Sequence, residues 1–192
     1  VGTFGHYLLA YAEELTRDFQ RLQDCYDRVN LCPLGGGPMG GTSFRIDRER
    51  TAKLLGFDGL VRNSLDATSS RDFMLEASSC LAILMVGVSR IAEDLVLWSS
   101  SEFGYVELSE QLSSVSSIMP QKKNPTVLEL IRGKSSRVVG NLTTLLGIMK
   151  GLNSGYSSDL QETKPVLWDS FDQTVDSLKI LICIFISLNI QP

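Results

Sequence analysis

Apolar side chains recur along this chain at alternating spacings of three and four residues, the period of one face of an α-helix. The pattern predicts long helices over about Phe4 to Val29, Phe73 to Trp98 and Thr126 to Gly151. In the first helix the spacing forms a heptad seam of Leu8, Ala12, Leu15, Phe19, Leu22, Tyr26 and Val29. Because a heptad seam is buried against another helix, we expect a partner helix along its whole length.

Local signals place the shorter elements and the last helix. Asp47 and Gly56 stand where the N-cap and C′ residue of a short helix over Arg48 to Leu55 belong. The last helix is expected to start within Asp159 to Pro165, because proline is tolerated in a first helical turn. Ile180 to Ile186 is β-branched enough for a buried strand, but no pairing strand is evident, so we expect helix. The chain is therefore predicted to be all-α, an elongated bundle of long helices with heptad-like seams.

One segment of the second long helix, Leu81 to Val88, is apolar on every face. Such a helix needs cover on all sides. A single domain of 192 residues supplies little of that cover, so subunits are expected to associate, and homo-oligomers are usually symmetric.

Composition and charge exclude several functions. A net charge of −4 without a basic stripe provides no field for binding a polyanion, so no nucleic-acid partner is expected. The most apolar segments, Cys80 to Val88 and Leu178 to Ile186, have roughly half the length of a membrane span. Val1 to His6 lacks the basic start and cleavage site of a secretory signal.

The cysteines and the histidine do not form a metal-binding pattern. No two cysteines are spaced as CxxC, and His6 is the only histidine. We therefore expect no metal and interpret the four thiols as reduced core side chains of a cytoplasmic protein. They are Cys25, Cys32, Cys80 and Cys183.

The stretch from Ser113 to Pro125 combines serines, two lysines, an amide and two prolines. Pro120 and Pro125 exclude the middle of a helix, so this is a loop leading into the helix that begins after Pro125. A helix N-terminus favours anions, and the loop brings hydroxyls, ammonium groups and an amide to it. The other glycine- and proline-rich stretch, Asn30 to Arg45, matches neither GxGxxG nor a Walker loop, which favours a crossover connection over a phosphate cradle.

Three blocks carry a resemblance to a known family. Ser116 to Pro125 reads S-S-I-M-P-Q-K-K-N-P and resembles the G-S-S-x-M-P-x-K-x-N-P signature of the fumarase/aspartase superfamily. The Gln-Lys-Lys variant is similar to that of argininosuccinate lyases, as are Asp66 to Phe73 (D-A-T-S-x-R-D-F) and Tyr156 to Lys164 (Y-x-x-D-L-Q-E-x-K). The resemblance implies cleavage of argininosuccinate into arginine and fumarate by anti elimination through an aci-carboxylate carbanion. It also implies a place in arginine biosynthesis or the urea cycle, without a cofactor.

Site residues follow from the resemblance, position by position. It implies that Ser116 is the base, acting as an alkoxide, that Lys122 offsets the developing charge and that Asn124 binds a substrate carboxylate. Glu129 matches the glutamate that pairs with a catalytic histidine. Substrate-binding positions are matched by Arg71, Tyr156, Gln161 and Lys164. Elimination beside a carboxylate independently needs a base and preorganised cations, because negative charge builds up there.

Alternatives remain at three positions. Arg71 could equally be a salt-bridging helix residue. Lys123 is expected to be a solvated or intersubunit charge rather than the catalytic lysine. His6 does not match the family's T-H-x-Q motif, so we interpret it as a packing or capping residue of the first helix.

The chain also departs from the family. It lacks the T-H-x-Q histidine, and Val115 replaces the glycine before the paired serines. We expect residues 1–192 to be a central helical-bundle domain, a fragment without the family's N-terminal and C-terminal domains. In the family this domain forms a homotetramer whose active sites each use three subunits, so the chain alone is expected to be inactive. The alternatives are a crystallin-like structural bundle without catalysis and another fumarate-releasing lyase.

Overall fold

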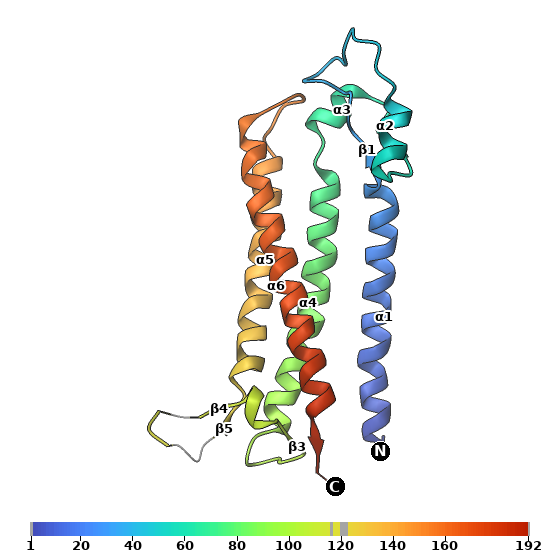
Figure 1. Ribbon diagram of the computed structural model, residues 1–192. Helices are drawn as coiled ribbons and strands as arrows, with labels where there is room; N and C mark the ends of the chain where they lie inside the picture. Colours follow the sequence, from blue (N-terminus) through green and yellow to red (C-terminus); the bar gives the residue numbers. More distant parts are fainter. Residues whose placement is uncertain (1, 116, 120–122, 192) are drawn as a thin grey trace. The chain divides into compact units, whose positions relative to one another are not determined.

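A computed structural model describes residues 2–115, 117–119 and 123–191 (Figure 1). Long helices carry most of the described chain: α1 (Phe4–Val29), α4 (Asp72–Trp98), α5 (Thr126–Met149) and α6 (Thr163–Ser187). The predicted all-α class and the positions of these helices are confirmed, including helix rather than strand over Ile180 to Ile186. None of the helices in the described ranges is long and apolar enough to span a membrane.

Two short helices precede α4. In α2 (Arg48–Leu55) the Asp47 side chain accepts a hydrogen bond from the Arg50 amide, and Gly56 adopts φ 80°, so both predicted caps are confirmed. Asn63 caps a separate helix, α3 (Ser64–Ser69), which the spacing pattern did not predict because it begins only at Phe73. The two helices are separate because Ser70 is extended, with ψ 141°.

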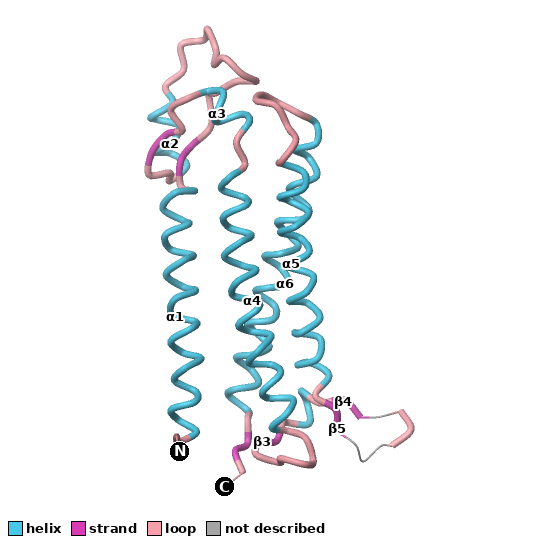
Figure 2. The backbone as a smooth tube through the Cα atoms, turned by 180° about the vertical axis from the view of Figure 1, so that it is seen from behind, coloured by secondary structure: helices cyan, strands magenta, loops and turns pink. Residues whose placement is uncertain are grey.

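Short strands lie between the helices and after α6 (Figure 2). The sequence pattern predicted none of the strands, because two residues are too few to show a period. The strands are β1 (Leu31–Cys32), β2 (Gly59–Leu60), β3 (Val106–Glu107), β4 (Ser114–Val115), β5 (Lys123–Asn124) and β6 (Asn189–Ile190). Strands β1 and β2 pair in parallel, while β3 with β6 and β4 with β5 pair antiparallel. The 3₁₀ turns are η1 (Glu110–Leu112) and η2 (Ser158–Glu162).

The chain forms two compact units. The first contains residues 1–16, 81–140 and 168–192, and the second contains residues 17–80 and 141–167. In the first unit α4, α5 and α6 share a core whose fully buried side chains include Met85, Val88, Ile91, Leu95, Leu128, Ile131, Val138 and Ile184. Hydroxyl side chains continue the buried seam of α6, where the Thr174 hydroxyl donates to the Ser170 carbonyl at 2.7 Å. Small hydroxyl groups bonded to their own helix can be buried without leaving a polar atom unsatisfied.

The predicted heptad seam of α1 is not covered along its length by the described chain. Phe19 and Tyr26 are 60% and 61% exposed. In the first unit α1 meets α4 through a different, polar face, where the Tyr11 hydroxyl donates to Asp94 and Glu14 pairs with Arg90. The expected partner helix is therefore α4, which meets α1 through Tyr11 and Asp94 in the first unit and through Arg28 and Glu76 in the second. Phe19 and Tyr26 of the predicted seam stay uncovered by the described chain.

Cover is also incomplete on the apolar segment of α4. Most of its side chains are buried, but Ile83 and Val86 are each 48% exposed.

His6 lies exposed in the first turn of α1, where its amide donates to the Thr3 hydroxyl at 3.2 Å. This position agrees with an ordinary residue at a helix end.

All four cysteines are free thiols, but they are not all in the core. Cys183 is exposed, contrary to our expectation, because it lies beside the buried α6 positions Leu181 and Ile184 rather than on their face. Cys25 and Cys80 face each other in the second unit, and burial raises the pKa of the Cys25 thiol to about 11. Cys25 therefore remains a protonated thiol at neutral pH.

Candidate functional site

The second unit contains a cavity of about 1630 Å³. It is lined by the end of α1, the β1–β2 pair, α2, α3, the start of α4 and the first turn of α6. Its acidic side chains are Glu49, Asp58, Asp66, Asp72 and Glu76. Its cationic side chains are Arg28, Arg48, Lys53, Arg62, Arg71 and Lys164. Two of the sequence-predicted binding residues, Arg71 and Lys164, thus line the same cavity.

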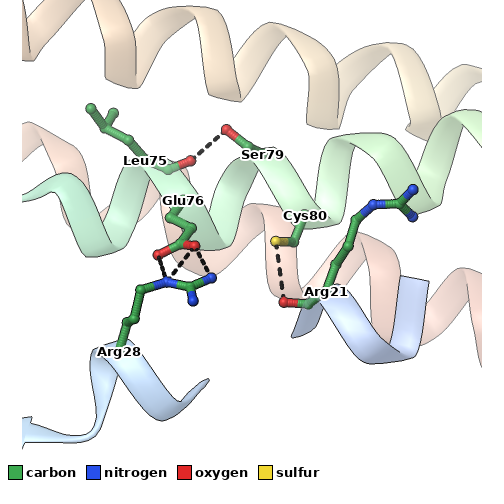
Figure 3. A network of polar contacts seen from close by, with 6 residues as sticks. All are labelled: Arg21, Arg28, Leu75, Glu76, Ser79 and Cys80. Atoms are coloured by element: carbon green, nitrogen blue, oxygen red, sulfur yellow. Dashed lines mark hydrogen bonds and ion pairs between the residues drawn. The ribbon is translucent and has the colours of Figure 1, made fainter. Parts of the chain in front are cut away.

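Two of the lining arginines already have strong partners. Arg28 Nε lies 2.9 and 3.1 Å from the two carboxylate oxygens of Glu76, a fork that joins α1 to α4 (Figure 3). Hydrogen bonding to Arg28 lowers the pKa of Glu76. Arg48 donates to two backbone carbonyls, Leu34 at 2.9 Å and Val61 at 2.8 Å. These cations hold the wall of the cavity together rather than offering free charge to a ligand.

Arg71 lies between α3 and α4 and is half-buried. Its guanidinium donates to the backbone carbonyls of Thr68, at 3.0 Å, and Ser70. Burial lowers the pKa of Arg71, although an arginine remains a cation in proteins. Within the described ranges it forms no ion pair, so the alternative of a salt-bridging helix residue is not what the structure shows. The result is a partly desolvated cation without a carboxylate partner among the described residues.

Tyr156, Gln161 and Lys164 are joined by hydrogen bonds. Gln161 Nε2 lies 2.9 Å from the Tyr156 hydroxyl, and Lys164 Nζ donates to Gln161 Oε1 at 3.2 Å. All three side chains are exposed. Leu160 and Thr163, which directly precede Gln161 and Lys164 in the sequence, are buried. The Thr163 hydroxyl donates to the Leu160 carbonyl at 2.7 Å. The junction of η2 and α6 is therefore anchored on one side and presents its amide and ammonium groups on the other.

The other predicted site residues belong to the first unit. Asn124 lies in β5 opposite Ser114 of β4, and Glu129 is exposed in the first turn of α5. This strand pairing brings Ser114 and Val115, which precede the signature segment, beside Lys123 and Asn124 near its end. Ser116 and Lys122, the predicted base and charge-offsetting lysine, lie outside the described residues.

Lys123 has partners within its own chain. Its ammonium lies 3.0 Å from Glu107 and 3.6 Å from Glu110, and the hydrogen bond to Glu107 raises the pKa of Lys123. Lys123 is exposed, as expected of a solvated charge, and β4–β5 pairing brings its side chain to these two exposed glutamates. Lys123 is thus occupied by carboxylates of its own unit.

The predicted site residues that the structure describes divide between the two units. Arg71, Tyr156, Gln161 and Lys164 all belong to the second unit, whereas Asn124 and Glu129 belong to the first. Sequence reasoning missed the charges that α2 and the segment after it add to the cavity wall, since no motif marks Arg48, Lys53 or Arg62.

Comparison with known proteins places the chain in a family. A protein-family model described as lyase matches residues 2–140. The chain belongs to this lyase family. It is 54% identical over 190 residues to the argininosuccinate lyase of Nitrosopumilus maritimus, covering 99% of the chain and 39% of that protein. It is 51% identical over 179 residues to the argininosuccinate lyase of Methanococcoides burtonii, covering 93% of the chain and 36% of that protein.

A solved structure agrees with these sequence matches. The crystal structure of an EDDS lyase in complex with formate superposes with a TM-score of 0.86 at 34% identity, covering 97% of this chain and 37% of that one. The resemblance drawn from the three sequence blocks is confirmed, and so is the helical fold of a lyase. The chain spans about two fifths of the length of the curated relatives it matches.

Proposed function

We propose that this chain is the helical part of an argininosuccinate lyase, which cleaves argininosuccinate into arginine and fumarate. The observation that carries the proposal is the pair of cations without carboxylate partners in the described chain, Arg71 and Lys164, lining one cavity in a chain half identical to argininosuccinate lyases. The curated relatives are enzymes, which favours a lyase over a bundle that has lost catalysis. All four cysteines are free, which supports a reducing compartment such as the cytoplasm.

The second-unit residues suit a substrate rich in carboxylates. Lys164 supplies a point charge, and Gln161 and Tyr156 extend it into a row of polar groups. Arg71 supplies a planar fork that matches carboxylate geometry. Since both lie at a cavity, a bound carboxylate would lose part of its water, which strengthens its attraction to them.

The chemical step is assigned by resemblance to residues of the first unit. A base removes the proton beside a substrate carboxylate, and the electron pair forms the carbon–carbon double bond. The carbon–nitrogen bond breaks with its electron pair staying on the guanidino nitrogen of arginine, which takes up a proton from a general acid. We propose Ser116 as the base and Lys122 as the cation that offsets the developing charge, as the resemblance implies. Asn124 would hold the carboxylate on which charge builds up, and Glu129 would orient a histidine from outside residues 1–192.

The activity is tested by following the absorbance of fumarate after addition of argininosuccinate. The 192-residue chain alone is expected to show no turnover. A hybrid, in which this chain replaces the matching part of the Nitrosopumilus maritimus argininosuccinate lyase, is expected to turn over. Ser116→Ala in that hybrid is expected to lower kcat by about 10²–10⁴-fold, the usual contribution of a positioned base.

Any of three results would contradict this assignment. A folded hybrid that converts fumarase-type or adenylosuccinate-type substrates but not argininosuccinate would move the protein to another lyase class. Full activity of Ser116→Ala would remove the proposed base. Robust turnover by the isolated chain would show that it needs no histidine from elsewhere.

We also propose that the chain forms a homo-oligomer, a tetramer by resemblance, with active sites shared between subunits. The exposed part of the heptad seam supports this, because Phe19 and Tyr26 of α1 lie unburied where a second helix would pack.

Sedimentation equilibrium tests the assembly. Phe19→Asp combined with Tyr26→Asp is expected to lower the association constant at least about tenfold, since two charges would enter an apolar interface. Leu54→Asp is the matched control, because Leu54 is 76% exposed on α2 and lies off the seam. Equal association of the wild type and the double variant would contradict a role of the seam in assembly.

A further inference from the structure

The glycine-rich loop of residues 35–41 is a turn with a defined backbone conformation. The Gly41 amide donates to the Gly36 carbonyl at 2.9 Å, which closes the loop on itself. Gly37 adopts φ 64°, and a Cβ there would lie 2.5 Å from the Gly41 carbonyl oxygen. Only glycine fits this position, so the loop has a defined shape.

One side of the loop is attached to α3. The Thr68 hydroxyl donates to the Gly37 carbonyl at 2.9 Å, and Gly36 packs so closely that a Cβ would lie 3.1 Å from that of Ala67. The Thr68 carbonyl in turn accepts the hydrogen bond from the Arg71 guanidinium. The loop and Arg71 are therefore held by the same residue.

The other side of the loop contacts the turn before Tyr156. Gly155 is buried with φ 110°, and a Cβ there would lie 3.2 Å from Met39 Cε and 3.6 Å from Met39 Sδ. Met39 itself is 52% exposed, so this contact is not a by-product of burial in a core. The Met39 side chain thus lies against Gly155, the residue directly before Tyr156.

We infer that Met39 is a positioning residue, which fixes the Tyr156, Gln161 and Lys164 row relative to Arg71. Tyr156 is 57% exposed, so little packing of its own holds it in place. The unbranched Met39 side chain reaches Gly155 from a loop that Thr68 ties to the turn holding Arg71. Because this row is proposed to bind a substrate carboxylate, losing the brace that Met39 forms against Gly155 would weaken substrate binding and so raise KM. The inference rests on the proposed function for the site that it positions.

Hydrogen–deuterium exchange of the 192-residue chain tests the brace without any turnover. Met39→Ala is expected to speed exchange of the backbone amides in residues 152–158 about tenfold, because the turn opens more often. Met39→Leu keeps an apolar side chain that reaches Gly155 and is expected to exchange like the wild type. Phe44→Ala removes a larger apolar side chain from the same connection, where Phe44 is 80% exposed, and is expected to change nothing.

Kinetics of the hybrid lyase provide the second measurement. Met39→Ala is expected to raise KM for argininosuccinate about tenfold and to change kcat by less than about twofold, with Met39→Leu restoring KM. Unchanged exchange in Met39→Ala would overturn the inference, and so would faster exchange with an unchanged KM. If the unsubstituted hybrid is inactive, the proposed function fails, while the exchange measurement still decides the brace.

Discussion

Lys164→Met is expected to lower kcat/KM of the hybrid lyase for argininosuccinate by about 10²–10³-fold. The Lys164 ammonium donates to Gln161 and forms no ion pair within the described ranges, so its charge is available to a substrate carboxylate. Replacing it by an apolar side chain of similar length would leave that carboxylate partly desolvated beside a cavity without its counter-charge. Release of fumarate, followed by absorbance, measures the effect.

Two comparison variants make the Lys164 result specific. Lys150→Met removes an exposed lysine of the same unit that does not line the cavity, and it is expected to leave kcat/KM unchanged. Lys164→Arg keeps the charge but changes its shape, so an intermediate loss is expected. Wild-type kinetics in Lys164→Met would rule out the assigned binding role.

The second large effect is on stability. Leu95→Ala in α4 is expected to lower the free energy of unfolding by about 2–5 kcal/mol, since Leu95 is fully buried in the core of the first unit. The loss combines the transfer of the side chain from water with the cavity left behind. Urea denaturation followed by circular dichroism, at one fixed chain concentration, measures it.

Leu54→Ala is the matched control for the core substitution. It makes the same chemical change on α2, where the side chain is 76% exposed, and is expected to change the free energy of unfolding by less than about 0.5 kcal/mol. Equal losses in the two variants would show that Leu95 is not part of the core that the structure places it in.

Local signals were sufficient for most of the helices. The Asp47 and Gly56 pair bounded α2 at both ends because capping involves only neighbouring backbone groups. The short helix α3 escaped prediction, since Ser64 to Ser69 is six residues long and mostly polar, too little to show a helical period. The β4–β5 pair escaped as well, because each strand is two residues long and its partner is distant in sequence.

Motifs identified the candidate site residues but not their arrangement. The Tyr156 to Lys164 block named three residues that the structure joins by hydrogen bonds, because they lie within one short turn and the helix that follows. That motif carried no information about Arg71, which lies far earlier in the sequence. Arg71 and Lys164 line one cavity only in the folded chain. The roles of Ser116 and Lys122 remain predictions from the resemblance.

The sequence by itself determined where the long helices lie, how α2 begins and ends, and which family the chain resembles. These features depend on neighbouring residues or on the order of residues in a motif. Only the tertiary structure decided which face of α1 meets α4, that Arg71 and Lys164 share a cavity, and that Met39 lies over Gly155. Contacts between residues this far apart in the chain depend on how the whole unit packs, and they leave no period or spacing for sequence reasoning to detect.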